Sequence, residues 1–155
     1  MTKLLRVAMT EVLRIALRAI GVVLPGAALW GFVEVTTGVP SGDFGTFLGA
    51  MLLSLLTAAV WAAIDASRAP ASRVLIRWGA IVVVVGGGLG IESTLSAPGG
   101  PPSQRTSEMV STSLFYCVPL LVAVGLGLAI GMATAAQNNQ ARRRYEATGG
   151  TGSGD

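Results

Sequence analysis

The sequence predicts an all-α integral membrane protein with four transmembrane helices in an antiparallel bundle. Only 12% of the 155 residues are charged and 52% are hydrophobic, whereas a soluble domain carries about 25% charged residues. The apolar residues also gather in four runs, and each run is close to the roughly 20 residues that a helix needs to cross a bilayer. Most of the surface of this chain is therefore expected to face lipid.

The chain divides into three predicted regions. Residues 1–15 are expected to form a cytoplasmic amphipathic segment, residues 16–136 the four-helix transmembrane domain, and residues 137–155 a basic and then flexible cytoplasmic tail. The helices of the transmembrane domain are expected at about 16–35, 45–64, 74–91 and 113–136. Helices are favoured over barrel strands because no run alternates strictly between polar and apolar residues, and because a helix satisfies its own backbone hydrogen bonds in hydrocarbon.

The first region carries polar residues at spacings of three and four, which places them on one helical face. They are Lys3, Arg6, Thr10, Arg14 and Arg18. Two interpretations stay open: residues 2–18 lie as a helix in the headgroup plane, or they extend the first transmembrane helix with their arginines reaching the surface. The stretch "PGAALWGFVEV" offers no clean small-x-small cleavage site before Glu34, so we expect an uncleaved anchor rather than a signal peptide.

The third run contains "IVVVVGGGLGIE", residues 81–92, which begins like a dinucleotide-binding loop. Gly86 and Gly88 fit the first two glycines of that fingerprint, but Ile91 occupies the third place and no crossover helix follows. Glycines one helical turn apart instead predict close helix packing. The pairs are Gly45 and Gly49, Gly86 and Gly90, and Gly127 and Gly131. Such spacings also arise by chance, because glycine is common in membrane helices.

Two prolines interrupt the predicted helices, Pro25 in the first and Pro119 in the fourth. A proline frees a backbone carbonyl and can kink its helix. Broken helices line substrate sites in transporters, but membrane helices also tolerate proline for structural reasons alone. Both interpretations stay open for these two positions.

The basic residues predict the orientation, with both termini cytoplasmic. Of the 11 lysine and arginine residues, Arg105 alone falls on the outer side if the four helices alternate in direction. The outer side instead carries Glu34, Asp43, Glu92 and Glu108. Aromatic residues mark the two boundaries: Trp61 and Trp78 flank the inner loop, and Trp30, Phe32, Phe44, Phe47, Phe115 and Tyr116 gather near the outer boundary.

The connections between helices are expected to be irregular. The inner loop "DASRAPASR" is short, so the second and third helices are predicted to be neighbours in a hairpin. Within that loop we expect Asp65 to pair with Arg68. The outer loop from Glu92 to Thr112 contains "APGGPP", and this density of proline and glycine disfavours a folded outer domain.

The residue types present argue against an enzyme. Histidine is absent and Cys117 is the single cysteine, which excludes disulfide frameworks, Cys/His zinc sites and histidine general bases. No acid lies near the middle of an apolar run, which disfavours a proton-coupled exporter. We therefore predict no catalytic residue, no cofactor and no metal.

The composition, rich in alanine, glycine and valine and in arginine over lysine, is typical of a high-GC bacterial genome and predicts the bacterial inner membrane. The predicted function is that of a structural or accessory subunit that packs against a second copy or a larger membrane protein. The alternative is an oligomeric pore or small transporter, including a holin-like permeabilising protein. Arg142, Arg143 and Arg144 are predicted to contact anionic lipid or an acidic partner, and nucleic-acid binding is not expected.

Overall fold

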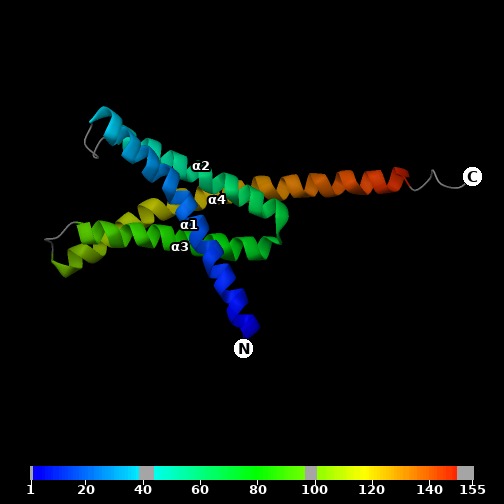
Figure 1. The fold of residues 1–155 in the computed structure, drawn as a ribbon, viewed down its shortest axis with the longest axis horizontal. Helices are drawn as coiled ribbons and strands as arrows, with labels where there is room; N and C mark the ends of the chain where they lie inside the picture. Colours follow the sequence, from blue (N-terminus) through cyan, green and yellow to red (C-terminus); the bar gives the residue numbers. More distant parts are fainter. Residues whose placement is uncertain (1, 39–43, 97–100, 150–155) are drawn as a thin grey trace, which may run out of the picture.

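The computed structural model describes residues 2–38, 44–96 and 101–149, and four helices make up almost all of them. They are α1 (Thr2–Thr37), α2 (Phe44–Arg68), α3 (Ala71–Ser96) and α4 (Pro102–Gly149). Figure 1 shows α1 and α2 meeting at one end of the molecule, as do α3 and α4, with the turn between α2 and α3 at the other. We call these the α3–α4 end, around Ser96 and Pro102, and the α2–α3 end, around Arg68 and Ala71.

All four helices are long and apolar enough to cross a membrane. Two of them are much longer than the roughly 30 Å of a hydrocarbon core. At 1.5 Å per residue, the 36 residues of α1 span about 54 Å and the 48 residues of α4 about 72 Å. Because α1 is one continuous helix from Thr2, the amphipathic N-terminal residues extend the first helix in this structure.

The long loop expected from Glu92 to Thr112 is wrong, because both flanking helices continue into it. α3 ends at Ser96 and α4 begins at Pro102. Proline suits the first position of a helix, because the backbone N–H that it lacks would have no hydrogen-bond acceptor within the helix there. The prolines and glycines therefore interrupt the helices over a short stretch only, of which residues 97–100 lie outside the described part of the chain.

The ends of α1 and α4 also differ from expectation. α1 ends at Thr37, and Gly38 follows with a positive φ of 64°, the left-handed geometry in which glycine commonly ends a helix. Asp43, expected on the outer side, lies outside the described residues. In the predicted flexible tail, residues 137–149 are helical, and residues 150–155 lie outside the description.

The helices pack in a different order from their order in the chain. The most extensive interface joins α2 to α4, the next joins α3 to α4, and that between α2 and α3 is the smallest. α4 therefore lies between α2 and α3, and the predicted contact between α2 and α3 is present but forms only a small interface. α1 packs mainly on α2 and crosses α3 (Figure 1).

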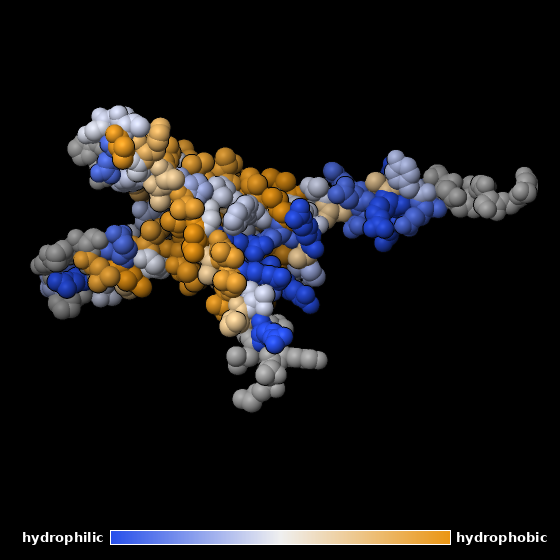
Figure 2. Space-filling view, in the orientation of Figure 1, coloured by the Kyte–Doolittle hydropathy of each residue, from blue (hydrophilic) through white to orange (hydrophobic). Residues whose placement is uncertain are grey.

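The core is apolar and lined with small residues on α2. Ala58, Ala62 and Ala66 are buried at intervals of one helical turn, so a second helix can approach this face closely. The largest fully buried side chains are Trp78, Ile81, Val22 and Val74. Figure 2 shows the apolar residues covering the middle of the molecule, with polar residues beside the N-terminal part and along the C-terminal part of α4.

Candidate functional site

Two of the predicted glycines lie where α4 meets the backbone of α2. A Cβ atom on Gly127 would meet the carbonyl oxygen of Ala59, and one on Gly131 would meet the carbonyl oxygen of Ala63 and the Cβ of Ala66. Both glycines are buried. The absence of a side chain at these positions allows α4 to lie against main-chain atoms of α2.

Gly86 and Gly90 occupy the corresponding place between α3 and α4. A Cβ on Gly86 would meet the Cys117 thiol, and one on Gly90 would meet the Ser113 hydroxyl and the carbonyl oxygen of Met109. The Cys117 thiol also donates a weak hydrogen bond to the carbonyl oxygen of Val82, with the sulfur 3.7 Å from that oxygen. These contacts bring the same face of α3 against α4 along two helical turns.

The third predicted pair is placed differently. Gly45 is exposed near the start of α2, and Gly49 has only an ordinary contact with Leu29. Sequence spacing missed Gly21 and Gly26 of α1, five residues apart. A Cβ on Gly21 would meet the Trp61 ring, and one on Gly26 would meet the Ser54 hydroxyl. The signal was obscured because the two glycines do not share the four-residue spacing of the other pairs.

Both prolines lie inside continuous helices, Pro25 in α1 and Pro119 in α4. Pro119 has no N–H to donate to the carbonyl of Phe115 one turn earlier, and Pro25 none to donate to the carbonyl of Gly21. A functional kink at either position remains a prediction.

A charged cluster at the α2–α3 end joins three helices. Arg18 of α1 donates to Asp65 of α2 at 2.6 Å, and the indole N–H of Trp78 on α3 donates to the other Asp65 oxygen at 3.2 Å. The Asp65 and Arg18 side chains are 13% and 23% exposed, so the pair is largely shielded from water. The predicted pairing of Asp65 with Arg68 is wrong, because Arg18 approaches from another helix.

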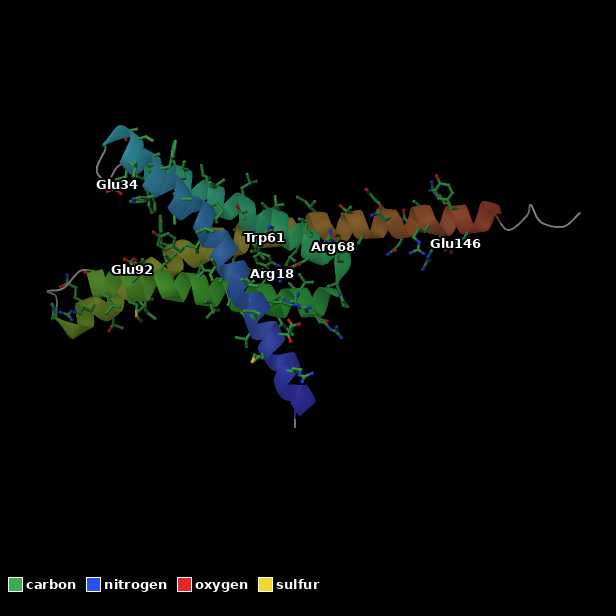
Figure 3. All side chains as sticks on the ribbon, viewed as in Figure 1. Arg18, Glu34, Trp61, Arg68, Glu92 and Glu146 are labelled. Atoms are coloured by element: carbon green, nitrogen blue, oxygen red, sulfur yellow. The ribbon has the colours of Figure 1, made fainter. Side chains whose placement is uncertain are left out.

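A second ion pair lies beside the first. Arg77 of α3 donates to Glu11 of α1 at 2.7 Å, and Arg14 donates to the other Glu11 oxygen at 3.0 Å. Glu11 is 42% exposed and Arg77 14% exposed. Two ionic contacts between helices, Arg18 with Asp65 and Arg77 with Glu11, thus hold the N-terminal half of α1 against α2 and α3. Figure 3 places Arg18, Trp61 and Arg68 toward this end, whereas Glu34 and Glu92 lie toward the other.

Aromatic rings gather at the α3–α4 end. The Phe47 ring lies 6.2 Å from Trp30, 6.4 Å from Phe115 and 6.3 Å from Tyr116, measured between ring centroids. The Phe115 and Tyr116 rings are 5.5 Å apart, edge to face. These four rings, from α1, α2 and α4, form one cluster in the geometry that aromatic pairs prefer.

A cavity of about 580 Å³ lies beside this cluster and is lined by all four helices. Its walls are mostly aliphatic and aromatic. Polar atoms enter the described lining from Trp30, Ser54, Glu92 and Tyr116, and Pro119 also lies in the wall. Small-molecule sites in proteins have this size and this mixture of apolar walls with a few polar groups.

The C-terminal part of α4 carries the predicted contact arginines. Arg142, Arg143 and Arg144 are exposed on a helix that projects beyond the other three (Figure 1). Their proposed role in contacting lipid or a partner remains a prediction. Comparisons with protein-family models, with curated proteins and with solved structures found no match to this chain.

Proposed function

We propose that the chain is a multi-pass protein of the bacterial inner membrane that acts as a structural or accessory subunit through helix packing. One observation carries this proposal: α4 packs between α2 and α3 and then continues beyond them as a basic helix. Because its membrane part is held between two helices, α4 can keep its C-terminal extension in a defined position for contact with a partner outside the membrane. Its exposed arginines fit an acidic partner or an anionic lipid surface.

The charge distribution supports placing both termini in the cytoplasm. Arg18 and Arg77 form ion pairs at the α2–α3 end, and Arg68 and Arg73 lie beside the turn there. Among the described residues near the α3–α4 end, Arg105 is the one that is basic. The positive-inside rule then assigns the α2–α3 end to the cytoplasm.

The alternative, an oligomeric pore or small transporter, requires a polar face on at least one helix. α3 has no polar side chain from Gly79 to Ile91. Among the described residues no polar or charged residue is fully buried, and the partly buried charges Arg18, Asp65 and Arg77 lie in ion pairs at the α2–α3 end. We therefore prefer the accessory role. The experiment described next also tests for the pore.

The test is purification of the full chain from bacterial membranes in mild detergent, with mass measurement of the particle. An accessory subunit should co-purify with a larger membrane protein at fixed stoichiometry, and its expression should leave the membrane potential intact. Changing Arg142, Arg143 and Arg144 together to glutamate should release the partner. The matched control is Arg68→Glu with Arg73→Glu, which alters exposed charge at the same end without touching the α4 extension.

A homogeneous oligomer of this chain alone, whose expression collapses the membrane potential, would support the pore and overturn the accessory role. A partner retained equally by the glutamate variant and its control would show that the arginines of α4 do not make the contact.

A further inference from the structure

A groove of about 270 Å³ lies at the α2–α3 end of the molecule, between α1 and α2. Its described lining consists of Leu17, Arg18, Trp61, Ile64, Asp65 and Arg68. Figure 3 shows the three labelled members, Arg18, Trp61 and Arg68, in one region of the structure. We call this feature the α1–α2 groove.

The polar side of the α1–α2 groove is positively charged, because two guanidinium groups and one carboxylate line it. The Asp65 carboxylate is already compensated: Arg18 donates to one oxygen at 2.6 Å, and the Trp78 indole N–H donates to the other at 3.2 Å. Arg68 is exposed at the last residue of α2, and no hydrogen bond or ion pair within the described part of the chain holds its side chain. One guanidinium is therefore left for a ligand.

The other side of the groove is apolar. Leu17 and Ile64 are both exposed, and the Trp61 ring packs over Gly21 of α1, where a Cβ atom would collide with it. Arg68 lies seven residues after Trp61 on α2, which is about 10 Å along the helix axis. The groove therefore changes from an aromatic and aliphatic surface to a guanidinium over a short distance.

This change matches the boundary between hydrocarbon and headgroups, where tryptophan also prefers to lie. A guanidinium binds phosphate oxygens through two parallel hydrogen bonds, while Leu17 and Ile64 offer apolar surface to an acyl chain. A zwitterionic lipid carries its own ammonium group near the phosphate and gains less from Arg68. A soluble phosphate gains nothing from the apolar side.

We propose that the α1–α2 groove binds one anionic phospholipid, with Arg68 contacting its phosphate and Leu17, Trp61 and Ile64 contacting the start of an acyl chain. The proposal rests on the membrane placement above, with the α2–α3 end in the cytoplasm, but not on the accessory role. It concerns a site separate from the arginines of the α4 extension. Because both α1 and α2 form the groove, the bound lipid should also stabilise the packing of α1.

The test measures lipid binding to the full chain in a nonionic detergent, from the mass of the intact protein–lipid complex. The probes are phosphatidylglycerol and phosphatidylcholine with identical acyl chains. We expect one phosphatidylglycerol per chain to bind at least about fivefold more tightly, which is the factor for one basic side chain near an anionic lipid. Inorganic phosphate should not displace it.

Arg68→Gln should weaken phosphatidylglycerol binding about fivefold, to the affinity of phosphatidylcholine. The matched control is Arg73→Gln, which should leave binding unchanged. Arg73 is also exposed and lies beside the same turn, but it does not line the groove. Arg68→Lys keeps the charge and should retain the preference for phosphatidylglycerol, which covers the case in which the glutamine variant does not fold.

Equal affinity for the two lipids would overturn the proposal, and so would displacement by inorganic phosphate, which would mark a site for soluble anions. Equal losses in the Arg68→Gln and Arg73→Gln variants would also overturn it, because the effect would then be one of general surface charge. A chain that purifies without a protein partner but keeps this lipid preference would refute the accessory role alone.

Discussion

The two ends of the molecule are held together by different interactions. At the α2–α3 end, Arg18 and Asp65 pair at 2.6 Å and Trp78 donates to the same carboxylate. At the α3–α4 end, four aromatic rings from three helices lie beside a cavity of about 580 Å³. Directional ionic contacts fix α1 against its neighbours at one end, whereas loosely directional ring contacts leave space at the other.

This contrast follows from the chemistry of the contacts. A charged pair in a partly buried site requires short distances, and leaving one partner alone there is costly. Aromatic contacts tolerate centroid separations from 4.5 to 7 Å, so helices can diverge while their rings still touch. We call the α2–α3 end the closed end and expect it to stabilise the packing of α1. We call the α3–α4 end, which holds the cavity, the open end and expect its ring contacts to contribute less to stability. Four substitutions test that division.

The largest effect is expected at Gly131, where α4 meets α2 on the side of the closed end. Gly131→Leu would drive a side chain into the carbonyl of Ala63, and neither backbone can yield easily. We expect a loss of at least about 3 kcal/mol in the free energy of unfolding, measured by denaturant titration in mixed micelles. Gly125→Leu is the control, because nothing lies within 4 Å of its Cβ position. Equal stability of the two variants would contradict the observed α2–α4 interface.

The next effect concerns Asp65. Asp65→Asn keeps the shape of the side chain but leaves Arg18 charged in a site where its side chain is only 23% exposed. We expect a loss of about 2 kcal/mol, below that for a fully buried pair because water still reaches both groups. A double-mutant cycle with Arg18→Gln measures the coupling. Additive losses in the two single variants would show that the pair is not formed.

A smaller effect is expected at the open end. Phe47→Leu removes the ring that contacts Trp30, Phe115 and Tyr116. Retained aliphatic bulk should limit the loss to about 1 kcal/mol, measured by the same titration. Exposed Phe44→Leu serves as its control, since Phe44 lies three residues earlier on α2 and is 74% exposed. A loss as large as that of Asp65→Asn would contradict the proposed division between the ends.

The smallest effect is expected for Glu11→Gln. Glu11 is 42% exposed although it binds both Arg14 and Arg77, so its charge is well screened by solvent. We expect the smallest loss of stability among the four substitutions, because exposed ion pairs contribute little. The loss should shrink further as salt is raised, because exposed pairs are screened. A loss that does not depend on salt would show that Glu11 is more deeply enclosed than its exposure indicates.

Much of the helical content could be predicted from the sequence, and much of the packing could not. Each apolar run lies in one helix, since a long apolar segment can satisfy its backbone groups only internally. The boundaries were less predictable, because Pro102 begins a helix where the local density of proline suggested a loop. Among the cavity residues, the types of Trp30, Phe47 and Tyr116 predict a common membrane boundary, but nothing in their spacing indicates a common cavity.

The amino-acid sequence alone is enough to predict four helices, each long and apolar enough to cross a membrane, because hydrophobic length and backbone hydrogen bonding act within a single segment. The position of α4 between α2 and α3 and the pairing of Asp65 with Arg18 are visible only in the folded molecule. These contacts join residues far apart in the chain. Which faces meet depends on where backbone can approach backbone, as at Gly127 and Gly131, and no spacing within one segment specifies the opposite surface.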